Sequence, residues 1–426
     1  MTWRDPFVAL LVAFAVAAAV TPLVARLARL LGAVDRPRGR GLAVGGTPLL
    51  GGLAIAAGVG VAIAISIGDF PSTPVWEGRS DNLHHILLGG LAITVVGVLD
   101  DRFDLHPLAK LAGQAAAAWI PVSQGVEVGN ITLPFLGALD FGSFGVPLTV
   151  AGFVVIMNVV NLSDGVDGLA AGVCAIAAIA LGIVAWDLQK EHASLLAGAT
   201  CGAALGFLVH NFHPARVFMG DTGANLLGFL LAAVAVEGSV KTGAVLALVV
   251  PLIVLAVPFL DTTFVVLKRL KARRPIYSAD QNHFHHRLSR LGFSQRRVVL
   301  YLYAWAGALA GVAIALRFVP YNDDHDHYDP LWTSVIVAIV LLVLAFSVYL
   351  VYLLEIVKLR RLDALRLRRL RPDVSEQDID ADVTRALETG EIDAITGEHR
   401  AVADHDDDRD RGRGTTGETP TVGPRG

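Results

Sequence analysis

Hydrophobic residues fill the first 356 positions in long continuous runs that are separated by short polar segments. With a window of about 19 residues, which suits membrane helices, we identify eleven candidate spans. They cover approximately 7–31, 49–67, 84–99, 107–122, 144–160, 168–186, 193–209, 223–237, 243–266, 298–318 and 331–356. The runs do not alternate with period two, so the pattern predicts helices rather than a barrel. The expected fold is an all-α, polytopic integral membrane protein.

The composition agrees with this class. Of the 426 residues, 54% are hydrophobic and 17% charged, and the mean hydropathy is +0.57. Soluble enzymes of this size are more polar. The first run, 7–31, is long enough to span, and its positive charge (Arg26, Arg29) follows the apolar stretch, so we interpret it as an uncleaved helix rather than a signal peptide. Cys174 and Cys201 both lie in apolar runs, where packing is the expected role.

Lysine and arginine are distributed unevenly between the loops. The loops on one side carry 17 of them and the loops on the other side carry five. The positive-inside rule places the richer side in the cytoplasm. With eleven spans, this predicts an outside N-terminus and a cytoplasmic C-terminus in the plasma membrane.

The composition changes abruptly after position 356. Residues 357–372 form a basic, leucine-containing juxtamembrane segment that suits the anionic inner leaflet. Residues 373–426 are rich in Asp, Glu, Arg, Gly and Thr, and such a composition predicts a disordered acidic cytoplasmic tail. Residues 1–356 are therefore expected to form the transmembrane domain.

The unusual polar motifs all fall on the predicted cytoplasmic side. They are Asp100–Asp101 at the end of the third span, the stretch from Asn158 to Asp167, "HNFHPARVFMGDTGA" from His210 to Ala224, and "DQNHFHHRL" from Asp280 to Leu288. Ionisable groups near membrane depth are costly unless they meet a partner, a metal or a water-filled cleft. A single catalytic site on the cytoplasmic face explains their clustering most simply.

Each motif also has a simpler structural interpretation. Asp164 and Asp167 could cap the following helix, and Asp221 could cap the eighth span. Asp100 and Asp101 could form a solvated helix end, or a pair that handles magnesium or phosphate, since Mg²⁺ typically takes one or two carboxylates and completes its shell with water and phosphates. Glycines around Asp221 would also allow helix-terminal amides to approach an oxyanion.

The histidine cluster His283, His285 and His286 could suggest zinc. It lacks a cysteine partner, and its spacing fits one helix face poorly. Nine Lys and Arg residues lie in the same loop, so diphosphate binding is the preferred interpretation.

Together these motifs resemble the polyprenyl-phosphate N-acetylhexosamine-1-phosphate transferases, relatives of the phospho-N-acetylmuramoyl-pentapeptide transferases. The resemblance runs from Asp35 to about Leu288. It rests on the Asp-Asp motif with Lys110 and Gln114, on NxxNxxDGxDGL from Asn158 to Leu169, on "HNFHPARVFMGDTGA", on Asp261, and on His-x-His-His followed by Arg287. The His-x-His-His form is similar to the N-acetylglucosamine-1-phosphate branch.

One position departs from the family. Many members carry Lys and His after the first span, where this chain has Gly41 and Ala43. The flanking matches are Asp35, Pro37, Arg40, Pro48, Gly51 and Gly52. This puts one nucleotide contact in doubt, and Arg38 or Arg40 are candidates to replace it.

The resemblance implies an enzyme that transfers N-acetylglucosamine-1-phosphate from UDP-N-acetylglucosamine to decaprenyl or undecaprenyl phosphate, with Mg²⁺ or Mn²⁺, as the first membrane step of a cell-wall or surface glycopolymer. Nucleic acid is not expected as a partner, and a homodimer is left open. The implied catalytic residues are Asp100, Asp101 and Asp221, with Asp221 and Asp101 as metal ligands. The implied substrate-binding residues are Lys110, Asn158, Asn161, Asp164, Asp167, Asn211, Phe218, His283, His285, His286 and Arg287.

Three alternatives stay open at this point. A muramoyl-pentapeptide substrate would fit the same family architecture. A transporter would place polar residues at mid-helix depth and show repeat symmetry. A non-catalytic scaffold for wall assembly would account for the tail but not for the Asp, Asn and His clusters.

Overall fold

The computed structural model describes residues 4–35, 46–67, 82–133, 137–238, 256, 259–260, 294–317 and most of 329–348. All of these residues belong to one compact unit. The predicted spans 243–266 and 331–356 lie partly outside the described residues. The following lie wholly outside them: Asp261, His283, His285, His286, Arg287, the basic segment and the acidic tail.

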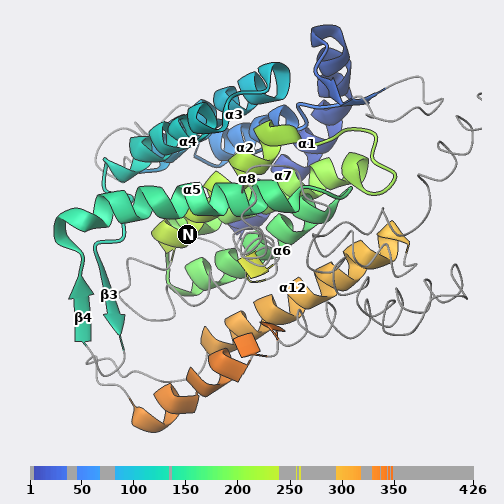
Figure 1. Cartoon of the computed structure of the whole chain (residues 1–426). Helices are drawn as coiled ribbons and strands as arrows, with labels where there is room; N and C mark the ends of the chain where they lie inside the picture. Colours follow the sequence, from blue (N-terminus) through green and yellow to red (C-terminus); the bar gives the residue numbers. More distant parts are fainter. Residues whose placement is uncertain are drawn as a thin grey trace, which may run out of the picture. The chain divides into compact units, whose positions relative to one another are not determined.

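The described chain is mostly helical (Figure 1). The α-helices described over their whole length are α1 (Arg4–Leu31), α2 (Gly52–Ile67), α3 (Asn82–Phe103), α4 (Pro107–Val122), α5 (Gly145–Ser163), α6 (Leu169–Asp187), α7 (Glu191–Asn211), α8 (Gly220–Gly238) and α12 (Gln295–Arg317). Nine of the eleven predicted spans therefore coincide with helices, within a few residues at each end.

A row of glycines brings α7 against α1. Gly198, Gly202 and Gly206 recur every four residues, and a Cβ atom at any of them would collide with the α1 backbone at Pro6, Leu10 or Phe14. Small residues at this spacing let two membrane helices approach closely. We refer to this contact as the glycine seam.

Two further glycines allow the N-terminus of α8 to lie against its neighbours. A side chain at Gly97 of α3 would meet the backbone of Thr222, and one at Gly52 of α2 would meet that of Gly223. The C-terminal part of α3 and the start of α8 are therefore in backbone contact. This approach places the carboxylates that end α3 beside the first turn of α8.

Short antiparallel hairpins complete the described fold. Strands β1 (Val34–Asp35) and β2 (Thr47–Pro48) pair after α1. Strands β3 (Asn130–Leu133) and β4 (Gly137–Asp140) pair before α5, and Figure 1 shows them projecting at the start of that helix. A 3-10 turn, η1 (Gly142–Phe144), joins β4 to α5. The expectation of an all-α fold thus needs a small correction.

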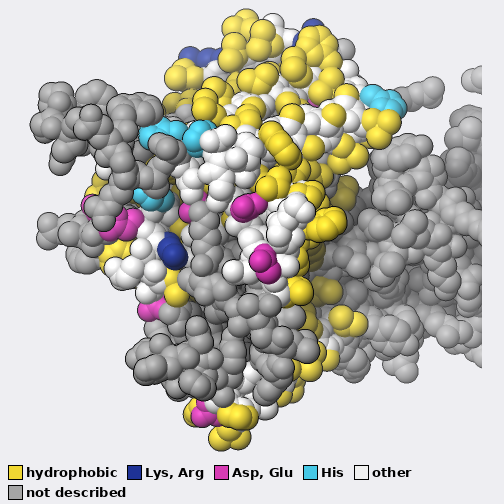
Figure 2. Space-filling model, turned by 90° about the vertical axis from the view of Figure 1, so that its left-hand side faces the viewer, with side chains coloured by type: hydrophobic (Ala, Val, Ile, Leu, Met, Phe, Trp, Pro, Cys, Tyr) yellow, Lys and Arg dark blue, Asp and Glu magenta, His cyan; other side chains and the backbone are white. Residues whose placement is uncertain are grey.

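Hydrophobic side chains cover much of the described surface in Figure 2, and charged side chains appear there as small separate spots. Large exposed apolar residues occur along α1, α3, α5 and α6, for example Leu23, Leu91, Val155 and Ile179. Contiguous apolar surface of this kind is costly in water and suits lipid. Within the described chain, six helices are long and apolar enough to cross a membrane, so this is a multi-pass membrane protein.

Candidate active site

Four helix termini meet at one end of the described unit and line a cavity of about 580 Å³. The C-terminal ends of α3, α5 and α7 and the N-terminal end of α8 contribute to it, together with the connections after α5 and α7. Its lining residues are Asp35, Leu49, Asp100, Asp101, Arg102, Asp104, Asn161, Asp164, Gly165, Val166, Asp167, Asn211, Phe218, Gly220 and Asp221. Motifs that are far apart in the sequence therefore line a single cavity.

This cavity is strongly acidic. Seven of its lining residues are aspartates, and among the described lining residues Arg102 carries the one positive charge. Carboxylates gathered at this density repel one another unless a cation compensates. The cavity is thus suited to holding a cation, and a bare diphosphate would be repelled from it.

Asp101 holds the first turn of α8. Its Oδ1 accepts a hydrogen bond from the backbone N–H of Asp221 at 2.7 Å. Its Oδ2 accepts from the N–H of Thr222 at 3.1 Å and from the Thr222 hydroxyl at 2.6 Å. Gly220, with φ of +69°, leaves room for this carboxylate, because a Cβ there would collide with it. The oxyanion at this helix N-terminus is therefore Asp101 itself, supplied by α3.

Lys110 of α4 joins two of the predicted catalytic carboxylates. Its Nζ lies 2.9 Å from Oδ2 of Asp100 and 2.7 Å from Oδ1 of Asp221. The other oxygen of Asp100 accepts the backbone N–H of Leu105 at 2.9 Å. Asp221 thus forms an ion pair rather than capping α8, and the buried Asp100 is fixed on both oxygens.

A chain of side-chain amides, of which Gln114 and Asn225 are buried, lies behind this ion pair. Asn158 of α5 donates to Oε1 of Gln114 at 2.7 Å, and Gln114 donates to Oδ1 of Asn225 at 2.8 Å. Asn225 in turn donates to the backbone carbonyl of Asp221 at 2.8 Å. Gln114 is one helical turn after Lys110, so α4 presents both to α8. Asn158, predicted to bind substrate, here joins α5 to α4.

Neither Asp164 nor Asp167 caps α6. That helix follows Gly168, which has φ of +81° and provides no side-chain cap. Oδ2 of Asp167 lies 2.8 Å from Nδ1 of His213 and accepts the N–H of Ala215 at 3.1 Å. The capping interpretation is wrong for both residues, and Asp167 instead joins the connection after α5 to the one after α7.

Asn211 reinforces the same junction. Its Oδ1 accepts the N–H of Gly168 at 2.9 Å and its Nδ2 donates to the carbonyl of Val217 at 2.9 Å. The backbone of Phe218 connects this junction to strand β2, because the Phe218 N–H donates a hydrogen bond to the carbonyl oxygen of Pro48 at 2.9 Å. Both predicted substrate residues line the cavity, and Asn211 also braces its wall.

Asp164 is partly buried and lines the cavity. Burial, followed by the negative charges of Asp221, Asp101 and Asp167, raises the pKa of Asp164 well above its usual range. A bound cation would stabilise the charged form of this carboxyl, because it would offset both the cost of burial and the repulsion from the neighbouring carboxylates.

Among the described residues, no group of three or more His, Cys, Asp or Glu side chains could enclose a metal ion. Mg²⁺ takes only one or two carboxylates and completes its shell with water and phosphates, and the acidic lining of the cavity supplies carboxylates of this kind. Asp221 engages Lys110 through Oδ1, whereas both oxygens of Asp101 already accept hydrogen bonds from α8. The ligand roles of Asp221 and Asp101 stay predictions.

Several contacts at the site were not anticipated from the sequence. They involve Thr222, Asn225, His213, Arg296 and Tyr303. Thr222 and Asn225 follow Asp221 by one and four residues, so helical spacing was an available signal for them. Arg296 and Tyr303 gave no signal, since they lie outside every polar motif.

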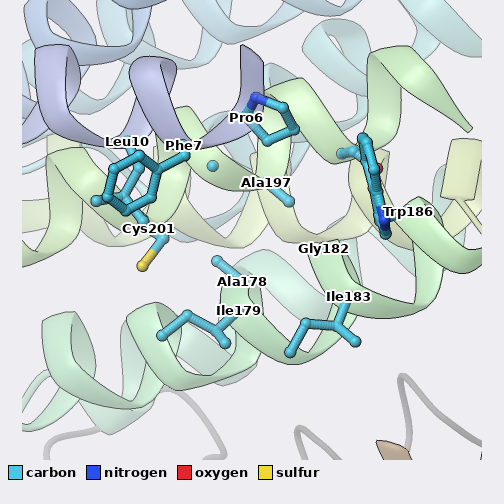
Figure 3. Close-up of a pocket in the computed structure, with 12 residues that line it drawn as sticks. Pro6, Phe7, Leu10, Ala178, Ile179, Gly182, Ile183, Trp186, Ala197 and Cys201 are labelled. Carbon is cyan, nitrogen blue, oxygen red and sulfur yellow. The ribbon is translucent and has the colours of Figure 1, made fainter. Parts of the chain in front are cut away.

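A second cavity of about 270 Å³ lies between α1, α6 and α7, near the opposite ends of α6 and α7 (Figure 3). Its labelled lining is apolar and includes Phe7, Ile183, Trp186 and Cys201. Among the described residues that line it there is no Asp, Glu, His, Lys or Arg.

The chain matches the family model of glycosyl transferase family 4 over residues 83–239, which include the helices that form the acidic cavity. It is 38% identical to the decaprenyl-phosphate N-acetylglucosaminephosphotransferase of Mycobacterium leprae (strain TN), over 71% of this chain and 81% of the relative. It is 27% identical to the undecaprenyl-phosphate alpha-N-acetylglucosaminyl 1-phosphate transferase of Escherichia coli (strain K12), over 74% and 83% of the two chains.

The chain therefore belongs to glycosyl transferase family 4. Within it, the chain falls among the membrane enzymes that transfer a phosphosugar.

Proposed function

We propose that this enzyme transfers N-acetylglucosamine-1-phosphate from UDP-N-acetylglucosamine to a polyprenyl phosphate, giving polyprenyl diphosphate-N-acetylglucosamine and UMP. The main structural support is the acidic cavity formed where the helix termini meet. There, a lipid held in the bilayer and a soluble nucleotide sugar can meet. The relatives named above are N-acetylglucosamine-1-phosphate transferases of decaprenyl and undecaprenyl phosphate.

In this reaction an oxygen of the lipid phosphate attacks the sugar-linked phosphorus of the donor. A new P–O–P bond forms, the bond to the bridging oxygen of the nucleotide breaks, and UMP leaves with that oxygen. Both reactants are anionic, so the enzyme must neutralise charge as they approach.

Mg²⁺ or Mn²⁺ is the proposed cofactor, with Asp221 as its first candidate ligand. When bound, it would supply positive charge and polarise the phosphoryl oxygens. Asp101 then has the clearer role of fixing the turn that carries Asp221, because both its oxygens accept hydrogen bonds from α8.

Asp100 is proposed to bind or deprotonate the lipid phosphate. Lys110 fixes its carboxylate next to Asp221 and provides a positive charge between the two acids. Asn161, Asp164 and Asp167 are proposed to contact the nucleotide. His283, His285, His286 and Arg287, outside the described residues, are proposed to hold the diphosphate.

We also propose eleven spans in the plasma membrane, with the N-terminus outside and both the active site and the C-terminus in the cytoplasm. The excess of Lys and Arg on one set of loops supports this orientation. The acidic residues lie at helix ends and not at mid-helix depth, which favours an enzyme over a transporter.

The direct test is an assay of purified protein in detergent with radiolabelled UDP-N-acetylglucosamine and defined polyprenyl phosphates. UMP should appear only when lipid phosphate and Mg²⁺ are both present. UMP formation without lipid phosphate, or no turnover with any polyprenyl phosphate, would contradict the proposal. A muramoyl-pentapeptide donor in a parallel reaction tests the related substrate.

A further inference from the structure

Helix α12 contacts both connections that line one wall of the acidic cavity, although it lies beyond the residues matched by the family model. We call residues 164–168 the first loop and residues 212–219 the second loop. Two side chains of α12, Tyr303 and Arg296, each donate a hydrogen bond to one loop. Neither side chain lines the cavity.

Tyr303 holds the end of the first loop. Its hydroxyl donates to the carbonyl of Gly168. The ring lies against Gly172 of α6, where a Cβ atom would collide with both ring and hydroxyl. The N–H of Gly168 donates to Asn211, so both polar groups of this peptide residue have partners. The loop is fixed at the residue where it enters α6.

Arg296 holds the second loop. Its Nε donates to the carbonyl of His213 at 3.0 Å. The ring of the same histidine lies 2.8 Å from Asp167, which belongs to the first loop. Arg296 therefore reaches the cavity wall indirectly, through His213. Arg296 holds the second loop and Tyr303 holds the first, and the contact between His213 and Asp167 joins the two loops.

We propose that Tyr303 and Arg296 are positioning residues that fix the two loops and thereby set the affinity for the nucleotide sugar. This inference rests on the proposed function, in which Asp164 and Asp167 contact the nucleotide. Asp100, Lys110 and Asp221 are held by α3, α4 and α8 instead. Loss of either α12 contact should thus affect donor binding more than the chemical step.

Tyr303→Phe tests the first contact, because it removes one hydroxyl and keeps the ring against Gly172. A neutral hydrogen bond contributes about 1 kcal/mol net, so the KM for UDP-N-acetylglucosamine should rise about fivefold. The kcat and the KM for polyprenyl phosphate should stay within about twofold of wild type, since the contacts that hold Asp100 and Asp221 are unchanged.

Arg296→Gln tests the second contact, and Arg297→Gln is its matched control. Both variants remove one exposed positive charge from the start of α12, but only Arg296 has the described bond to His213. We expect a higher donor KM for Arg296→Gln and wild-type values for Arg297→Gln. Arg296→Lys, which keeps the charge and a donor, should recover part of the loss.

Hydrogen exchange and UMP binding provide readouts that do not require turnover. Exchange at residues 164–168 and 212–219 should increase in Tyr303→Phe and Arg296→Gln, and the UMP concentration that gives half-maximal thermal stabilisation should rise in parallel. If both variants melt earlier but keep wild-type donor KM and UMP binding, the contacts are merely structural and the inference is overturned. If wild type itself releases no UMP, the proposed function fails, and the exchange and binding measurements still decide the loop-fixing role.

Discussion

The ammonium nitrogen of Lys110 lies 2.7 Å from Oδ1 of Asp221, although the two residues are 111 positions apart in the chain. The same nitrogen contacts Asp100. Removing one partner of a partly buried ion pair is costly when it leaves the other uncompensated. Here Lys110 has two carboxylates, so a change at one acid leaves the lysine paired with the other.

Asp221→Asn should therefore abolish turnover with little loss of stability. A neutral amide lacks the charge that a hard cation needs, and Lys110 keeps its contact with Asp100. We expect kcat/KM to fall at least about 100-fold, equivalent to about 2.7 kcal/mol, with weaker magnesium dependence. Asp140→Asn, on the hairpin before α5, is the control. Near-normal UMP release by folded Asp221→Asn would rule out the ligand assignment.

Changes at Asp101 should reduce both stability and activity. Asp101→Asn weakens three hydrogen bonds to the start of α8, which should cost about 1–2 kcal/mol of unfolding free energy. Gly220→Ala should act in the same direction, because its Cβ meets the Asp101 carboxylate and its φ is positive. Thermal melting in detergent measures both. A melting temperature equal to wild type in either variant would contradict the capping role.

Asp164→Asn and Asp167→Asn should each lower kcat/KM by about two orders of magnitude or more, or about 2.7 kcal/mol. At position 167, asparagine keeps an acceptor for His213 and for the N–H of Ala215, and at both positions the change removes the negative charge. Expression and melting temperature should barely change at neutral pH in the presence of magnesium. Variants that turn over like wild type would show that neither acid contributes to the site.

The stability of the metal-free protein should depend on Asp164 in a defined direction. The raised pKa of Asp164 means that the folded state binds this proton more tightly than the unfolded state. The free energy of unfolding therefore falls as pH rises from the ordinary Asp value of about 3.9 through the raised pKa. In EDTA, Asp164→Asn should melt higher than wild type at pH 8, and the gap should close toward pH 4. Parallel pH curves for the two proteins would refute this.

Truncation after Pro372 should leave specific activity within a few-fold of wild type. Every residue that lines the acidic cavity in the described chain precedes position 222, and the tail is composed like disordered sequence. The assay is UMP release in detergent, with a melting curve to confirm folding. Loss of activity in a well-folded truncation would give the tail a functional role.

The sequence alone located the helices well, because a helix that crosses a bilayer needs about 20 consecutive apolar residues, and such runs are easily recognised. It also identified several of the polar residues that line the cavity, such as Asp100, Asp164 and Asn211, since polar side chains stand out in such a background, but it did not single out Asp104. It could not show that Asp101 holds Thr222 or that Gln114 lies between Asn158 and Asn225. Those pairings depend on how helices rotate and approach, which is determined by contacts such as Gly97 against Thr222.

The hairpin of β3 and β4 was missed for a different reason. It is short and lies between two apolar runs, and a search for membrane spans treats such a segment only as a loop. Tyr303 was missed because an aromatic residue within an apolar helix is ordinarily explained by packing. Its partner is a backbone carbonyl, and a sequence gives no indication of that kind of acceptor.

The glycine seam has a consequence for the order of synthesis. About 160 residues separate the end of α1 from the start of α7, which at about 5–20 residues per second takes the ribosome roughly 8–32 seconds. During this interval α1 is already made, but the glycines that receive its backbone do not yet exist. A nascent chain that stalls before α7 thus leaves the face of α1 that packs on the glycine seam without its partner helix.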